Sequence, residues 1–125
     1  MLDQYRETEI RTASPEMLVV KMYEGAIRFA RQAIDMNESG RLVERGNALS
    51  RCMAIVAELR NSLDHEQGAE IAANLERLYN FVSERLLDAN LQGSSASIRE
   101  AIRVLEVLLS AWVEIANGNK GEAAP

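Results

Sequence analysis

The 125-residue sequence contains a single cysteine, Cys52, and a single histidine, His65. One cysteine excludes an internal disulfide and is compatible with a reducing cytosol. One histidine excludes the di-iron and di-manganese bundles, because these need a Glu-x-x-His pair on each of two helices. A zinc site is equally poorly supported, since we expect His65 in a loop and Cys52 on a buried helix stripe. We therefore expect neither a metal nor a cofactor.

Long apolar runs and an excess of basic charge are also missing. No apolar window approaches the roughly 18 residues that a transmembrane helix needs. Residues 1–14 are rich in charged side chains and have no apolar run, so we predict no secretory signal peptide. The net charge is −5, and the basic residues are interleaved with acidic ones, whereas nucleic-acid binding needs a clustered basic surface. We expect a cytoplasmic protein without membrane insertion and without a nucleic-acid partner.

Catalytic groups are scarce as well. The sequence places no carboxylate in an apolar pocket of the kind that general acids and bases occupy. On a core stripe, Cys52 is expected to behave as a small hydrophobe and not as a nucleophile. His65 lies between Asp64 and Glu66, where an added phosphate would meet two like charges. These observations predict that the protein is not an enzyme.

Helical patterns occupy most of the chain. Ser14 is a strong N-cap and Pro15 suits the first helical position, so the first helix is expected over about residues 15–36. Apolar residues then recur every three or four positions in three further stretches. These stretches are residues 41–63, residues 69–90, and a last one from the serines at 94–97 to near residue 117.

Short polar breaks separate the four stretches, and no strand pattern is present. This predicts an all-α fold, an antiparallel up-down four-helix bundle over residues 14–117. Residues 118–125 are interpreted as a disordered tail. Residues 1–13 show no sustained periodicity of apolar residues and are either a frayed terminus or a flexible N-terminal arm. In the second interpretation, Tyr5 and Ile10 lie on surplus apolar surface of the bundle.

The first and fourth helices have wider apolar faces than a bundle requires. Their apolar stripes span roughly 220° and 200°, against about 120° for the third helix. Either both helices are central, or part of their surface is a groove for an amphipathic helix of another chain. The candidate contact residues for such a partner are Val20, Tyr23, Ile27, Ile34, Ile55, Val104, Leu108 and Ile115.

Several blocks of sequence resemble the flagellar secretion chaperone FliS family. Tyr5, residues 10–18 (IRTASPEML) and residues 23–29 (YEGAIRF) are similar to its opening. Residues 58–64 (ELRNSLD) and the positions that follow are similar to its central signature. Those positions are Gly68, Glu70-Ile-Ala72, Asn74-Leu75, Leu78-Tyr79, Arg85-Leu86, Ala89-Asn90 and Trp112.

The resemblance covers about residues 5–113 and departs from the family pattern in two places. Met22 stands where leucine is usual before the tyrosine, and Ala69 stands where a second glycine is usual. Loss of that glycine is expected to make the start of the third helix less adaptable.

The resemblance implies a cytoplasmic export chaperone that binds the C-terminal segment of flagellin without ATP. It would hold that segment as separated helices around the bundle, prevent premature polymerisation, and deliver the subunit to the flagellar type III export gate. The family's N-terminal arm is expected to lie over part of the client site, which carries over to Tyr5 and Ile10. The resemblance leaves open whether an anti-sigma factor or another flagellar regulator also binds. Two alternatives remain: a four-helix phosphotransfer or signalling adaptor that uses His65, and a purely structural, self-associating bundle.

Overall fold

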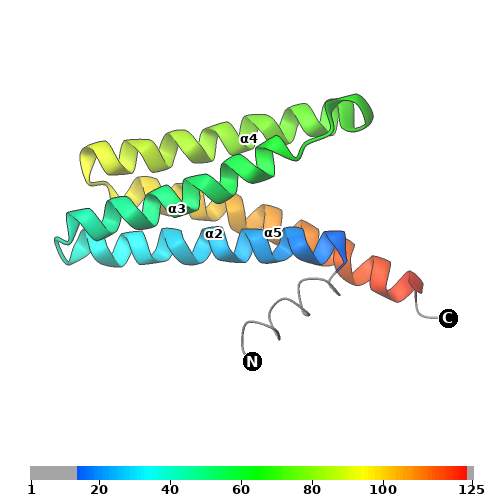
Figure 1. Ribbon diagram of the computed structural model, residues 1–125, viewed down its shortest axis with the longest axis horizontal. Coiled ribbons are helices and arrows are strands. Elements are labelled where there is room, and N and C mark those ends of the chain that lie inside the picture. The colour runs from blue at the N-terminus through cyan, green and yellow to red at the C-terminus, as the bar shows by residue number, and fades with distance from the viewer. Residues whose placement is uncertain (1–13, 124–125) are drawn as a thin grey trace.

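The computed structural model describes the backbone of residues 14–123 and the side chains of residues 14–118. This part of the chain forms four helices and no strand: α2 (Pro15–Glu38), α3 (Leu42–Asn61), α4 (His65–Gln92) and α5 (Ser95–Ala123). The helices lie side by side and alternate in direction (Figure 1). The predicted all-α four-helix bundle is therefore confirmed. None of the helices in the described residues is long and apolar enough to cross a membrane.

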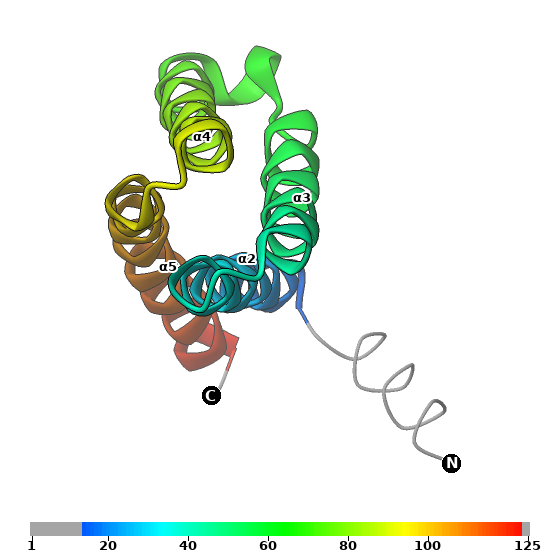
Figure 2. The same ribbon diagram turned by 90° about the vertical axis from the view of Figure 1, so that its left-hand side faces the viewer.

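Viewed end-on, the helices occupy the four corners of the bundle (Figure 2). Helix α2 packs against α3 and α5, and α4 packs against the same two helices from the opposite corner. The core between them contains side chains from all four helices. Its buried members are Tyr23, Ala26, Ile27, Ala30 and Ala33 of α2, Ala48, Leu49, Cys52, Val56 and Leu59 of α3, Tyr79, Val82, Leu86 and Ala89 of α4, and Ile98, Ala101, Ile102 and Leu105 of α5.

Helix α2 has the predicted start and stop signals. The Ser14 Oγ accepts a hydrogen bond from the Met17 N–H at 3.1 Å, and Pro15 occupies the first turn. At the other end, Gly40 has a φ of 73°, the left-handed conformation that glycine adopts without a Cβ clash. The Arg41 N–H donates to the Met36 carbonyl at 2.8 Å, as in a Schellman motif. The sequence thus predicts both ends of this helix to within two residues.

Helix α4 begins four residues earlier than predicted. The Asp64 Oδ1 accepts hydrogen bonds from the Glu66 and Gln67 N–H groups, both at 3.1 Å, and so caps an extra turn. At Ala69 the helix is interrupted, because φ is 38° and ψ is −106° there. Such a backbone conformation costs a non-glycine residue about 1–3 kcal/mol. The predicted start near residue 69 therefore marks the main part of α4 but misses the preceding turn, whose residues are polar and show no period.

Helix α5 is capped by Ser94, whose Oγ accepts a hydrogen bond from the Ser97 N–H at 3.1 Å. The helix ends later than predicted, since the backbone of residues 118–123, expected to be a disordered tail, is helical. A glycine such as Gly118 lowers helix propensity by about 1 kcal/mol but does not by itself end a helix.

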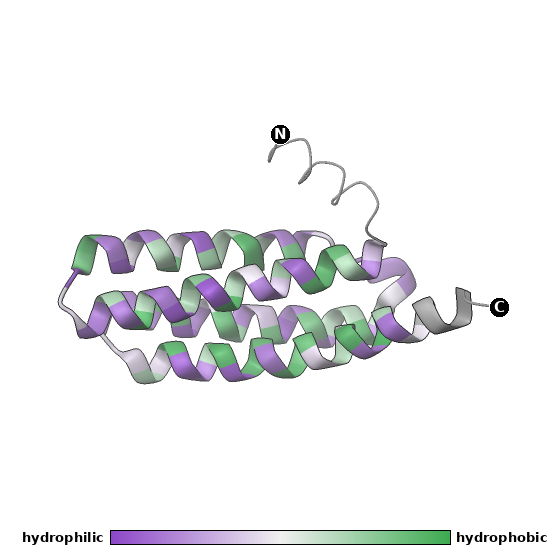
Figure 3. Cartoon of the chain, turned by 90° about the horizontal axis from the view of Figure 1, so that it is seen from below, coloured by the Kyte–Doolittle hydropathy of each residue, from purple (hydrophilic) through white to green (hydrophobic). Residues whose placement is uncertain are grey.

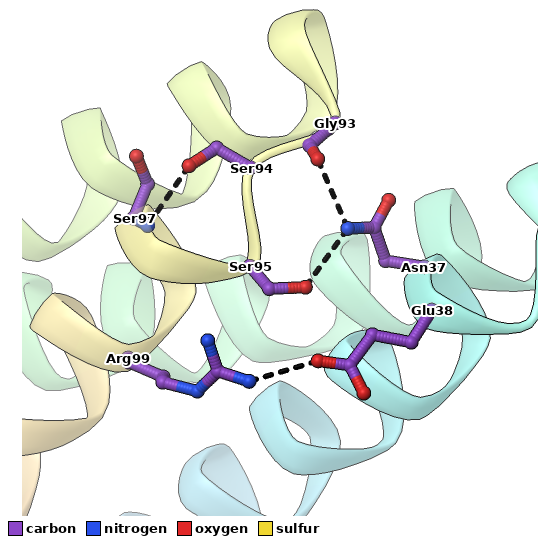
Figure 4. Close-up of polar contacts among 7 residues, drawn as sticks. All are labelled: Asn37, Glu38, Gly93, Ser94, Ser95, Ser97 and Arg99. Atoms are coloured by element: carbon purple, nitrogen blue, oxygen red, sulfur yellow. Dashed lines mark hydrogen bonds and ion pairs between the residues drawn. The ribbon is translucent and has the colours of Figure 1, made fainter.

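Polar side chains join the end of α2 to the start of α5. The Asn37 Nδ2 donates to the Gly93 carbonyl at 3.0 Å and to the Ser95 Oγ at 2.9 Å (Figure 4). Next to them, the Arg99 guanidinium forms an ion pair with Glu38 at 2.8 Å. These contacts fasten the α2–α5 pair at this end of the bundle. The opposite end, where α2 begins, contains the site described next.

Candidate functional site

A buried tyrosine pair crosses the bundle from α2 to α4. The Tyr23 and Tyr79 hydroxyl groups form a hydrogen bond, and the ring centroids are 6.4 Å apart. Burial raises the pKa of both hydroxyls above the usual value, and the Tyr79 hydroxyl raises the pKa of Tyr23 further. Both side chains therefore stay neutral and serve as core residues.

An apolar cleft lies beside this pair, at the end of the bundle where α2 begins. It has a volume of about 400 Å³, and all four helices contribute to its walls. We call it the end cleft. Its lining residues are Val19 of α2, Leu59, Ser62 and Leu63 at the end of α3, Asp64, Gly68, Ala72, Leu75 and Tyr79 at the start of α4, and Trp112 of α5. Walls of this kind suit apolar side chains of a ligand.

A second apolar surface runs along the seam between α4 and α5. The Ser97 Oγ donates to the Asp88 Oδ2 at 2.9 Å, which fixes how the two antiparallel helices are aligned. In this alignment, residues of α4 before Asp88 lie level with residues of α5 after Ser97. Helical periodicity then brings apolar side chains of both helices to the same flank. We call them the α4–α5 strip: Ile71, Leu78 and Phe81 of α4, with Val104, Val107, Leu108 and Ile115 of α5.

Much of the α4–α5 strip is open to solvent. The exposed fractions of Ile71 and Val107 are 71% and 70%, although both are large aliphatic residues. Hydrophobic residues recur along α5 from Ile98 to Ala116, in the helix that leads to the C-terminus in Figure 3. Scattered exposed apolar residues are ordinary, but a continuous row of them marks an interaction surface. The strip therefore has the chemistry to bind an apolar helix face.

The seam between α2 and α5 has a different character. Its groove has a volume of about 520 Å³ and carries mainly charged and polar side chains, among them Glu24, Arg28 and Asp35. Arg31 of α2 and Glu106 of α5 form an ion pair across it at 2.9 Å, with both side chains half-exposed. The groove between α2 and α5 is thus more polar than the α4–α5 strip.

The structure separates the eight predicted contact residues into three groups. Val104, Leu108 and Ile115 belong to the α4–α5 strip, in which Ile115 is exposed while Val104 and Leu108 are half-buried against the core. Ile34 and Ile55 are half-buried and pack against the core. Val20, Tyr23 and Ile27 are buried, so a client could contact them only if the helices of this closed bundle moved apart. The reason is that α2 lies between α3 and α5, and its wide apolar face is covered by two neighbours. Tyr5 and Ile10, predicted to cover the client site, lie outside the described residues.

Sequence reasoning missed the contribution of α4 to the strip. Ile71 and Leu78 sit beside the core stripe of α4, and Phe81 lies outside it. Phe81 is partly covered by the Arg85 guanidinium, whose carbon is 5.8 Å from the ring centroid. The contribution of α4 could have been predicted from this second row of apolar residues, which recurs at helical spacing outside the core stripe.

The described residues offer little reactive chemistry. They contain no group of three or more histidine, cysteine, aspartate or glutamate side chains that could hold a metal ion. Burial raises the pKa of the Cys52 thiol to about 12, so the thiol stays protonated at neutral pH. His65 is half-exposed and lies 3.4 Å from the Glu76 carboxylate. The arrangement favours binding of apolar surfaces over catalysis.

Comparison with known proteins agrees with this picture. The family model described as "Flagellar protein FliS" matches residues 1–119. The flagellar secretion chaperone FliS of Salmonella typhimurium is 36% identical over 110 residues, which cover 87% of this chain and 82% of the relative. The protein of the same name from Campylobacter jejuni is 35% identical over 113 residues, or 90% of this chain and 88% of the relative. A more distant relative, FliS of Bacillus subtilis, is 24% identical and still covers 86% of this chain and 80% of itself. The chain therefore belongs to the FliS family of flagellar secretion chaperones, which is not an enzyme class.

Proposed function

We propose that this protein is a cytoplasmic export chaperone for flagellin. It binds the C-terminal segment of flagellin, prevents premature polymerisation, and delivers the subunit to the flagellar type III export gate. Membership of the FliS family supports the class of function, and the exposed apolar α4–α5 strip is the observation that supports the mode of binding.

The dimensions of the α4–α5 strip fit a helical client. From Ile71 to Phe81, and from Val104 to Ile115, each helix rises by about 15 Å at 1.5 Å per residue. This length matches about three turns of an amphipathic helix, which would place anchors at positions i, i+3 or i+4, and i+7. We propose that one client helix lies along the strip and that the end cleft receives a large apolar side chain from a neighbouring part of the client.

Binding of this kind needs no ATP. A client segment that is unfolded before binding loses conformational freedom when it forms a helix on the strip, which lowers the affinity per unit of buried area. Moderate affinity is useful to a carrier, because the client must be released to the export apparatus. We propose that the apolar contacts protect the client in the cytoplasm and that release follows when another partner competes for them.

The proposal is tested by charge substitutions in the α4–α5 strip. Val107→Asp and Ile71→Asp place a carboxylate on the strip at residues that are already mostly exposed, so the fold should be unaffected. Val43 of α3 is the matched control, because it is an exposed aliphatic residue, at 72%, that lies on α3, away from the seam of α4 and α5. Each variant is titrated with a peptide of the flagellin C-terminal segment, and its helix content is checked by circular dichroism.

We expect Val107→Asp and Ile71→Asp to weaken peptide binding about tenfold or more, because a client helix would have to bury an unpaired carboxylate. Val43→Asp should bind as the wild type does. If both strip variants bind normally, the client site lies on another face. If the wild type binds no flagellin peptide, flagellin is not the client.

A further inference from the structure

The turn before Ala69 contributes to the rim of the end cleft and buries little of its surface. Its residues are Asp64-His-Glu-Gln-Gly68, and we call this segment the cleft flap. None of its side chains is apolar, and only Gly68 is as much as half-buried. Segments with few buried apolar contacts open at low free-energy cost, independently of the rest of a domain.

Mostly local polar contacts hold the cleft flap in place. The Gly68 N–H donates to the Asp64 carbonyl at 2.7 Å, which closes one helical turn within the flap. His65 and Glu76 link the flap to the main part of α4 at 3.4 Å, with both side chains half-exposed. A Cβ atom added to Gly68 would lie 3.1 Å from the Ala72 Cβ, so the flap is folded closely against the following turn.

Ala69 supplies a reason for the flap to move. It is the one non-glycine residue with positive φ among the described residues, and its φ of 38° and ψ of −106° are sparsely populated for an L-amino acid. A helical Ala69 would relieve this strain and join the flap to α4 as one continuous helix. Because Asp64 and Gly68 both line the end cleft, this rearrangement would remove part of its rim.

We propose that the cleft flap is a two-state gate for the end cleft. In the closed state Ala69 has positive φ and the flap lines the cleft. In the open state Ala69 is helical and the flap leaves the cleft rim, which admits a large apolar side chain of the client. The gate itself rests on the geometry of the flap, and only the identity of its ligand rests on the proposed function.

Substitutions at Ala69 shift the two states in opposite directions. Ala69→Gly favours the closed state, because glycine adopts positive φ readily. Ala69→Val disfavours it, because a β-branched residue at positive φ clashes with the backbone. Ala73 is the matched control, an exposed alanine one turn later in the regular part of α4. Ala73→Gly and Ala73→Val change helix propensity without a positive φ.

Trp112 reports the state of the cleft without any client. It is the only tryptophan in the sequence and lines the end cleft, so acrylamide quenching of its fluorescence measures access to the cleft. We expect Ala69→Gly to reduce quenching and raise the melting temperature, whereas Ala73→Gly lowers the melting temperature and leaves quenching unchanged. Ala69→Val should increase quenching. The gate is refuted if Ala69→Gly has a lower melting temperature, as Ala73→Gly does, and its quenching stays at the wild-type level. This comparison requires only that the two glycine variants fold.

The link between the gate and client binding has its own readout. The affinity for a flagellin C-terminal peptide should fall about threefold or more in Ala69→Gly, because the fraction of molecules that can bind is smaller. Ala73→Gly should bind as the wild type does. Unchanged affinity in Ala69→Gly, together with reduced Trp112 quenching, would overturn the role of the gate in client binding. If no variant binds the peptide, including the wild type, the proposed function fails, while the fluorescence comparison still decides whether the gate exists.

Discussion

The hydroxyl groups of Tyr23 and Tyr79 hydrogen bond to each other in the core and join α2 to α4 across the diagonal of the bundle. The main helix contacts are between neighbours around the ring, and this pair adds a polar link between opposite corners. It also lies directly behind the end cleft, because Tyr79 is one of the cleft residues. The pair therefore helps to set the spacing of the helices that form the cleft.

Removing one hydroxyl of this pair should destabilise the protein. In Tyr23→Phe the Tyr79 hydroxyl loses its partner in the core, which costs about 1–3 kcal/mol. Replacing both tyrosines with phenylalanine should cost less than the sum of the two single variants, because no unpaired hydroxyl remains. Urea unfolding of the four proteins measures this coupling. Additive effects would show that the two hydroxyls do not depend on each other.

The tyrosine pair also predicts how stability changes at high pH. Burial raises the pKa of both hydroxyls in the folded protein, whereas the unfolded chain ionises near pH 10. The contribution to stability is therefore complete below pH 10 and is lost as the pH rises above it. In a Tyr5→Phe variant, which retains only this pair, phenolate absorbance should not rise until the protein unfolds. A phenolate signal near pH 10 with intact helix content would contradict the burial of the pair.

The sequence predicted the helices well where local signals decide them. Ser14 and Pro15 mark the start of α2, and Gly40 marks its end, because capping and left-handed φ depend on a few neighbouring residues. Local propensity does not predict the strained Ala69, since nothing local favours positive φ at an alanine, and the one hint was the glycine that is usual at this position in the family pattern. Its conformation depends on where α3 ends and on how the flap packs against α4, and neither can be deduced from the residues near Ala69.

The sequence predicted only part of the candidate site, for a related reason. A wide apolar stripe shows that a helix has much surface to bury, but not which helices cover it. On α2 the stripe is covered by α3 and α5, so Tyr23 and Ile27 belong to the core. On α5 the flank that carries Leu108 and Ile115 reaches the surface beside α4. Only the arrangement of the four helices separates these two cases.

Two leucines on the inner faces of α4 and α5 should differ in their effect on stability. Leu105 is fully buried, so Leu105→Ala should cost about 2–5 kcal/mol through lost burial and the cavity left behind. Leu75 is half-buried and lines the end cleft, so Leu75→Ala removes fewer contacts and should cost less. Thermal melting of both variants measures the difference. Equal losses would mean that the end cleft is closed around Leu75.

Ile27 and Ile115 provide the sharpest test of how the structure divides core from surface. Both were predicted as contact residues, but Ile27 is buried in the core, whereas Ile115 is 46% exposed on the α4–α5 strip. Ile27→Asp would bury an unpaired carboxylate and should unfold the protein or destabilise it by about 4 kcal/mol or more. Ile115→Asp should keep the wild-type circular dichroism spectrum and melting temperature, because its carboxylate can stay hydrated. A folded Ile27→Asp variant with normal stability would show that α2 presents this face to solvent. In that case the client site would include α2, as the width of its apolar stripe first indicated.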